Sequence, residues 1–332
     1  METKLANIRA GTYTRSDFML ADAKDADMGG GIGMAGPRRR ADGTFDGTRS
    51  RREYLDAIAE VVKQDIVDIM LVSNSNLELL TEDGVFEESG VQPAIRANEA
   101  TDIFGGLRGQ TYTRQMSIPH RSVVLSTAKT NLGLYSMTFN NDLDADLRTL
   151  EAFKEFRAEA GASQFRYFLE VFNPNAPVDL DPKSIPHFIN DHIVRSLAGV
   201  VKANRPLFLK IPFNGPAAIE ELATFDPTLI VGVLGGGAGT TRDTFELVYQ
   251  AERYGARLAL FGRKINLAES PLALTALMRE VANGTILPYE AVKAYHGVLK
   301  SERIVPTRAL DEDLKITEGP LMSACSAELV SR

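Results

Sequence analysis

Three apolar runs decide the fold of this chain: PLFLKIPF at 206–213, TLIVGVLGGGAG at 228–239 and ARLALFGRKI at 256–265. The segments between them, GPAAIEELATF at 215–225 and TRDTFELVYQAERYG at 241–255, carry apolar residues at helical spacing. Strands that alternate with helices are typical of parallel β/α units. Such units bind ligands at the carboxyl ends of their strands. We therefore expect a functional site where these three runs end.

The same alternation continues toward the N-terminus and predicts a single (β/α)8 barrel over about residues 16–300. A long, glycine-rich and basic loop, 24–52, follows the first strand, and a polar extension, 300–332, follows the last helix. The region 90–132 has the least regular pattern; there we expect a third strand at ATDIF and a helix near RSVVLSTAK. The other four strands are predicted at 18–22, 66–73, 132–142 and 166–172.

Composition limits the classes of function. A chain of 332 residues with 44% hydrophobic residues can bury one large core, so we expect one domain. The formal net charge of -7 argues against a nucleic-acid partner, which would need a basic surface. No run approaches the roughly 18 apolar residues of a membrane span. The single cysteine, Cys325, cannot form an intrachain disulfide, so we expect a cytoplasmic protein, and we also expect a homo-oligomer.

Two charged residues lie inside otherwise apolar strands. Lys210 stands in PLFLKIPF and Glu170 in RYFLEVF. Burial disfavours a charged ammonium, and a buried lysine that loses its proton can attack a carbonyl to form a Schiff base. A nearby carboxylate can supply the proton transfers that this chemistry requires. The alternative is a purely structural ion pair between the two side chains, and the two interpretations are compatible.

Further candidates follow from their positions at strand ends. Asp22 ends the first predicted strand and is expected to be a third acid on the same rim, unless it only caps a helix or closes a loop. Tyr135 lies on the fourth strand and could donate a proton, although a tyrosine in a strand more often packs. Asp102, Arg108 and Lys129 in the irregular region could line the site, and Lys129 is counted with the substrate-binding residues.

The glycines after the seventh strand predict an anion site. Gly235, Gly236 and Gly237 precede a helix, and free backbone amides at such a position bind anions. Gly262 and Arg263 follow the eighth strand, and barrels hold phosphate in the loops after strands seven and eight. The four histidines are scattered, so no metal site and no cofactor are expected.

In this order of residues the chain resembles the class I aldolases, in particular the tagatose-bisphosphate and archaeal-type fructose-bisphosphate aldolases. The resemblance covers about residues 165–285 and is loose before that. It implies that Lys210 forms the Schiff base and that Glu170 and Asp22 handle protons. It also implies that Gly236, Gly237, Gly262 and Arg263 hold a substrate phosphate, so the partner would be a phosphorylated sugar or a similar anion.

Two other functions use the same residues. A sugar-phosphate isomerase or epimerase would use Glu170 as its base and Lys210 only as an electrostatic partner. A non-catalytic ligand-binding barrel would keep Lys210 and Glu170 closed off from solvent and saturated by one another. The long loop 24–52 differs from the resembled families, and we expect it to influence which substrate is bound.

Overall fold

Eight parallel strands form a closed barrel in the computed structural model, which describes residues 1–40, 42–100, 107–237 and 239–330. The strands neighbour one another in the order β10, β9, β8, β5, β4, β1, β12, β11, and a parallel bridge from Ile211 to Val233 joins the two ends. The predicted TIM barrel is therefore confirmed. Its strands are β1 (Met19–Lys24), β4 (Ile69–Val72), β5 (Gln92–Arg96), β8 (Leu132–Thr138), β9 (Arg166–Phe172), β10 (Leu209–Lys210), β11 (Gly232–Leu234) and β12 (Leu258–Phe261).

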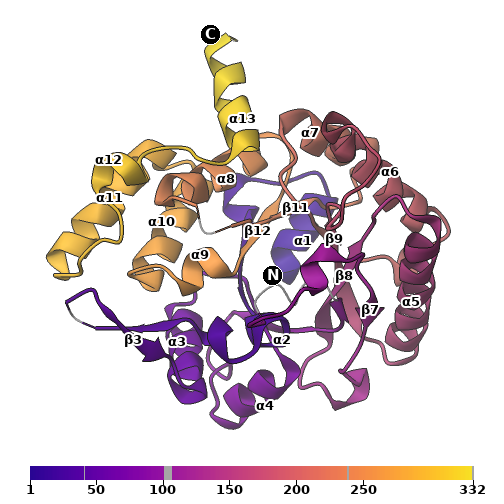
Figure 1. Ribbon diagram of the computed structural model, residues 1–332, viewed down its shortest axis with the longest axis horizontal. Coiled ribbons are helices and arrows are strands. Elements are labelled where there is room, and N and C mark those ends of the chain that lie inside the picture. The colour runs from indigo at the N-terminus through magenta and orange to yellow at the C-terminus, as the bar shows by residue number, and fades with distance from the viewer. Residues whose placement is uncertain (41, 101–106, 238, 331–332) are drawn as a thin grey trace.

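Helices surround the strands as an outer ring (Figure 1). Successive strand residues point to opposite faces of the sheet, so each strand has one side toward the barrel axis and one toward the helices. Leu134 and Phe168 belong to the inner core, whereas Tyr135 and Leu169 pack in the outer core. The ring consists of α3 (Arg51–Gln64), α4 (Asn74–Glu82), α5 (Leu143–Ala162), α6 (Ile185–Ala198), α7 (Pro216–Phe225), α8 (Thr241–Arg253), α10 (Pro271–Asn283) and α11 (Pro288–Ser301).

Helix α1 (Glu2–Arg9) closes the amino end of the barrel. Its Leu5 is fully buried in the inner core. Glu2 forms an ion pair with Arg166, the first residue of β9, at 2.6 Å, and Arg9 donates a hydrogen bond to the carbonyl of Leu207. This helix therefore covers the amino end of the barrel interior, opposite the carboxyl ends of the strands.

The third barrel strand is β5, which corrects our placement at 100–104. Pro93 and Arg96 interrupt the apolar pattern of β5, so this strand has no clear signal in the sequence. The strand tolerates Pro93 because β8 pairs only with Ile95 and Arg96 and leaves Pro93 outside that ladder. Ala100, the first residue of the strand that we expected at 100–104, belongs to the short β6 (Glu99–Ala100), which pairs with β7 (Pro119–His120). The other four residues, Asp102 among them, lie outside the described residues. The expected helix at 121–129 is a single 3-10 turn, Leu125–Thr127.

The long segment after β1 contains structure of its own. It holds α2 (Ala26–Gly30), a 3-10 turn (Gly31–Ala35) and the antiparallel hairpin of β2 (Pro37–Arg39) and β3 (Phe45–Thr48). Arg39 donates hydrogen bonds to Val305 and Thr307, and Arg49 to Asn266. Two of the arginines that make this loop basic therefore fasten it to the barrel and to the C-terminal extension.

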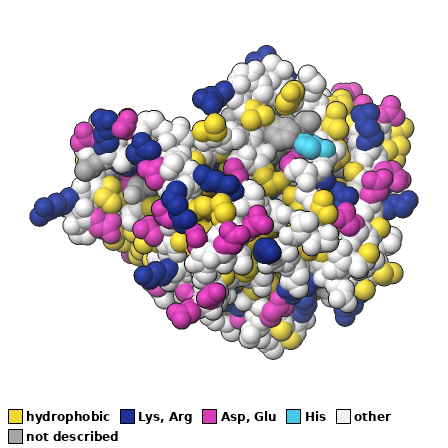
Figure 2. All heavy atoms as spheres, turned by 90° about the horizontal axis from the view of Figure 1, so that it is seen from below, with side chains coloured by type: hydrophobic (Ala, Val, Ile, Leu, Met, Phe, Trp, Pro, Cys, Tyr) yellow, Lys and Arg dark blue, Asp and Glu magenta, His cyan; other side chains and the backbone are white. Residues whose placement is uncertain are grey.

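The C-terminal extension contains α12 (Leu310–Asp313) and α13 (Gly319–Val330), which projects from the barrel next to α8 (Figure 1). Short α9 (Arg263–Asn266) follows β12, and further 3-10 turns lie at Arg15–Asp17, Tyr112–Arg114, Pro182–Ser184 and Lys202–Asn204. None of the helices within the described ranges is long and apolar enough to cross a membrane. Figure 2 shows acidic and basic side chains interspersed over the face that it presents.

Candidate active site

A cavity of about 630 Å³ opens at the carboxyl ends of the barrel strands. Its wall includes side chains and glycines from six strands or the loops that directly follow them, so the barrel itself positions the site. The polar part of the wall divides into two ends. One end contains Asp25, Arg96, Glu170 and Lys210, and the other contains Gly235, Gly236, Gly262 and Arg263.

Lys210 and Glu170 lie side by side because their strands are paired in register. Glu170 is also in register with Ser136, so β8, β9 and β10 present three polar side chains in one row. The ammonium Nζ of Lys210 is 2.6 Å from Glu170 Oε1, and Ser136 donates a hydrogen bond of 2.6 Å to Glu170 Oε2. Both charged residues are buried, at 6% and 1% exposure, yet both line the cavity. The pair is therefore within reach of a ligand.

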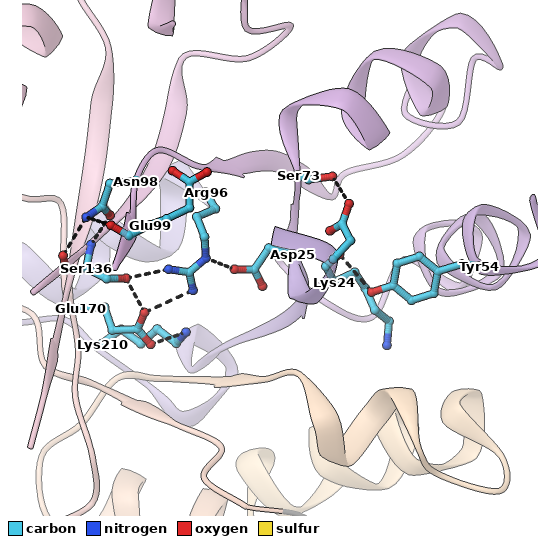
Figure 3. Close-up of polar contacts among 11 residues, drawn as sticks. Lys24, Asp25, Tyr54, Ser73, Arg96, Asn98, Glu99, Ser136, Glu170 and Lys210 are labelled. Carbon is cyan, nitrogen blue, oxygen red and sulfur yellow. Dashed lines mark hydrogen bonds and ion pairs between the residues drawn. The ribbon is translucent and has the colours of Figure 1, made fainter. Parts of the chain in front are cut away.

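Arg96 connects the two acids of this end (Figure 3). Its Nε donates to Asp25, its Nη1 donates to Ser136 at 2.9 Å, and its Nη2 lies 3.4 Å from Glu170. Asn98 holds the Ser136 backbone through bonds of 2.7 and 2.9 Å to its nitrogen and oxygen. The two carboxylates, Asp25 and Glu170, are thus matched by two cations, Arg96 and Lys210, within one buried network. Buried charges are tolerated when they are paired in this way.

Asp25, and not Asp22, is the aspartate at the cavity. Residues 21, 23 and 25 alternate toward the barrel axis, and Ala23 and Asp25 line the cavity. Burial alone would raise the pKa of Asp25, but the positive charges of Arg96 and Lys210 and the hydrogen bond from Arg96 outweigh it. The pKa therefore lies below its ordinary value, and Asp25 is a carboxylate at neutral pH.

Asp22 lies on the opposite face of β1, between the strand and the helices. It is fully buried and forms an ion pair of 3.2 Å with Lys24. Burial raises the pKa of Asp22 to about 6, although the Lys24 charge opposes this, and burial also lowers the pKa of Lys24. Figure 3 shows the Lys24 ammonium directed away from Arg96 and Glu170. This pair belongs to the outer layer and does not face the cavity.

Two other predicted residues also lie apart from the cavity. Tyr135 is buried in the outer core, where its ring stacks on Phe156 at 4.3 Å between ring centres. Lys129 is exposed and precedes β8, so it lies toward the amino ends of the strands. Arg108 is also exposed.

The glycine end is formed by the loops after β11 and β12. Gly236 adopts a left-handed φ of 66°, and a side chain on Gly235 would approach Phe261 to 2.6 Å. Arg263 donates a hydrogen bond of 3.1 Å from Nη2 to the carbonyl of Gly236, which ties the two loops together. Gly237 is exposed and does not contribute to the cavity wall. Backbone amides and one guanidinium at this end suit a bound anion.

Sequence reasoning missed Arg96, Ser136 and Asp25. Arg96 lies in β5, which the sequence did not indicate because Pro93 interrupts its apolar pattern. Nothing in the sequence marks Ser136 as a site residue until its register with Glu170 is known. Extending the first strand to its true end at Lys24 would have identified Asp25 by alternation. Across the part of the chain that the structure describes, no group of three or more His, Cys, Asp or Glu side chains could hold a metal ion.

Comparison with known protein families found no matching family model, and comparison with curated proteins found no match. Among solved structures, an archaeal fructose 1,6-bisphosphate aldolase has a TM-score of 0.60 at 12% identity, over 84% of this chain and 99% of that one. Another archaeal fructose-1,6-bisphosphate aldolase structure, with its catalytic lysine bound to a carbinolamine intermediate, has a TM-score of 0.58 at 14% identity, over 84% and 99%. A Corynebacterium glutamicum protein has a TM-score of 0.57 at 16% identity, over 86% and 94%. At these identities the likeness shows the fold alone, the TIM barrel that aldolases use.

Proposed function

We propose that this chain is a class I aldolase that forms or cleaves a carbon–carbon bond in a phosphorylated ketose or a related sugar derivative. The observation that carries the proposal is the Lys210–Glu170 pair, with 2.6 Å between nitrogen and oxygen, on the wall of an open cavity. A cavity at the carboxyl ends of barrel strands is where TIM-barrel enzymes act. The likeness to barrels of Schiff-base aldolases supports the choice of reaction class.

The proposed reaction begins when Lys210 transfers a proton to Glu170 and its free amine attacks the substrate ketone. The carbinolamine that forms accepts a proton at its hydroxyl, loses water and becomes an iminium. In the cleavage direction a carboxylate removes the C4 hydroxyl proton, the C3–C4 bond breaks, and its electrons pass to the iminium. Asp25, ionised and on the cavity wall, replaces Asp22 as the candidate for this base.

The glycine end supports the assignment of a phosphorylated substrate. Gly235, Gly236, Gly262 and Arg263 line the same cavity as Lys210, so one ligand can contact both ends. Lys210 would then bond to the carbonyl carbon while Arg263 and the loop amides receive the anionic group. A sugar that carries both a carbonyl and a phosphate would fit these two ends of the cavity.

Borohydride trapping tests the proposal. Incubation with fructose 1,6-bisphosphate or dihydroxyacetone phosphate and borohydride should add one covalent adduct to the wild-type chain, located on Lys210 by peptide mass. Lys210→Met should give no adduct, whereas Lys154→Met, on the exposed face of α5, should label like wild type. An adduct that persists in Lys210→Met would overturn the assignment. Formation of an isomeric sugar phosphate without an aldehyde product would favour the isomerase alternative.

A further inference from the structure

Another buried lysine lies directly beneath the glycine loop, defined here as Gly235, Gly236, Gly237 and Gly239. The side chain of Lys264 is 1% exposed, and its ammonium would be 2.9 Å from a Cβ on Gly239. The ammonium therefore contacts the loop itself. Its partner is Glu318, at 3.0 Å between Nζ and Oε1, which comes from the C-terminal extension.

The chain segment that carries Glu318 is fastened to the start of α8. The carboxylate of Asp243 accepts hydrogen bonds from the hydroxyl of Thr317 at 2.6 Å and from its backbone nitrogen at 2.8 Å. The hydroxyl of Thr240 donates to the carbonyl of Lys315 at 2.7 Å. Burial favours the neutral form of Asp243, but the hydrogen bonds that its carboxylate accepts from Thr240, Thr317 and Glu318 outweigh it and lower the pKa, so Asp243 is negatively charged.

The four charged side chains around the glycine loop cancel one another. Arg263 and Lys264 are positive, and Asp243 and Glu318 are negative. The two carboxylate oxygens of Glu318 lie 3.6 Å from where a Cβ of Gly236 would be, so the negative charge stands against the loop whose amides an anion would use. An arriving phosphate therefore meets no net positive charge while Glu318 stays in place.

We propose that Glu318 is an internal counter-anion that competes with the phosphate group of the substrate for Lys264, and so determines how strongly the cavity binds phosphorylated substrates. This inference rests on the proposed function for the identity of the ligand. Asp243 is buried and fixed by several hydrogen bonds, whereas the Glu318 side chain is 29% exposed and can turn toward solvent. When Glu318 turns away, the loop gains one net positive charge and the phosphate takes its place beside Lys264.

Inorganic phosphate is the probe for the first test, with affinity measured by isothermal titration calorimetry on the full chain. Glu318→Gln keeps the size of the side chain and removes its charge, and it should bind phosphate roughly three- to tenfold more tightly than wild type. Glu312→Gln is the matched control, since Glu312 is exposed and pairs with Lys315 in the same extension. It should leave the affinity unchanged. Lys264→Met should weaken phosphate binding.

Equal phosphate affinity in wild type and Glu318→Gln would overturn the inference, even if the variant unfolds at a lower temperature. Absence of measurable phosphate binding in both proteins would overturn it as well.

Borohydride trapping with dihydroxyacetone separates this inference from the proposed function, because that ketone carries no phosphate. Wild type should give an adduct on Lys210 with this ketone. If no adduct forms with any ketone while Glu318→Gln still tightens phosphate binding, the aldolase proposal fails and the counter-anion stands. If adducts form and phosphate affinity does not change, the counter-anion fails and the aldolase proposal stands.

Discussion

Each end of the site has a buried lysine paired with a glutamate, but only Lys210 and Glu170 line the cavity, whereas Lys264 and Glu318 lie against the glycine loop. Lys210 and Glu170 lie on neighbouring strands in register, and their side chains are 8% and 2% exposed. Lys264 is 1% exposed, whereas its partner Glu318 is 29% exposed and comes from a segment fastened by hydrogen bonds outside the barrel. The barrel ladder holds the backbones of the first pair side by side, whereas the second pair joins the barrel to a separate segment and can separate by a movement of the Glu318 side chain.

This difference suits two kinds of chemistry. A proton transfer needs a donor and an acceptor held within hydrogen-bond reach, which neighbouring strands provide for Lys210 and Glu170. Binding of an anion beside Lys264 requires that its present counter-charge can move away. Glu318, in the C-terminal extension at the surface, meets this requirement.

The largest effect is expected from Glu170→Gln, which removes the proton acceptor of the rigid pair. The amide can still accept the Ser136 hydrogen bond, so the barrel should fold, but Lys210 loses the group that takes its proton. We expect the rate of borohydride-trapped adduct formation to fall about 10²- to 10⁴-fold in single-turnover measurements. Glu221→Gln, at a half-exposed position on α7, should stay within about twofold. A Glu170→Gln rate equal to that of wild type would show that another group accepts the proton.

The next prediction concerns Arg96, which positions both acids of the same end. Arg96→Met leaves Asp25 and Glu170 buried without their shared cation, and an unpaired buried charge costs about 3–5 kcal/mol. The free energy of unfolding in urea should fall by about that amount. Arg148→Met, exposed on α5, should change it by less than about 0.5 kcal/mol. Equal stability of the two variants would mean that water replaces Arg96 in the network.

A site residue could be predicted from the sequence only where its chemical character differs from that of its neighbours along the chain. Lys210 and Glu170 were predictable because a charge inside an apolar run is costly unless it is used. Arg96 could not be found, because Pro93 broke the run that would have marked its strand. Asp25 was missed because alternation identifies a face only when the strand end is known, and β1 extends two residues beyond Asp22.

The partners of the glycine end were hidden for another reason. Gly236 and Arg263 were predicted from their positions after the last two strands, which the β/α pattern specifies. Glu318 reaches Lys264 across 54 residues of chain, and Thr317 reaches Asp243 across 74. No local periodicity encodes such contacts, since they depend on how the C-terminal extension packs on α8.

A third lysine–acid pair, Asp22–Lys24, tests whether burial alone explains the behaviour of such pairs. Burial raises the pKa of Asp22 from 3.8 to about 6, so the folded chain binds this proton more tightly than the unfolded chain. The stability that this group contributes is present below pH 3.8 and is lost as the pH rises through about 6. The unfolding free energy of wild type should therefore decline relative to Asp22→Asn between pH 4 and pH 7, by up to about 3 kcal/mol.

Urea unfolding of both proteins at several pH values measures this difference. Asp56→Asn, exposed on α3, is the control and should show no such trend relative to wild type. A difference between wild type and Asp22→Asn that is constant from pH 4 to pH 7 would show that Lys24 keeps Asp22 ionised in the folded state. The outer pair would then resemble Lys210–Glu170 in its charges while lacking access to the cavity.

The smallest effect is expected from the glycine loop, where two neighbouring glycines provide a matched pair. Gly239 has a left-handed φ of 42°, and a Cβ there would lie 2.8 Å from Asp243 Oδ2 and 2.9 Å from Lys264 Nζ. Gly239→Ala should therefore push the ammonium away from the loop and lower stability by about 1–2 kcal/mol, and inorganic phosphate should bind more weakly. Gly237→Ala, with open space around its Cβ and no left-handed φ, should leave both quantities unchanged. Equal phosphate affinity in the two variants would mean that Lys264 acts from a distance and that contact with the loop is not required.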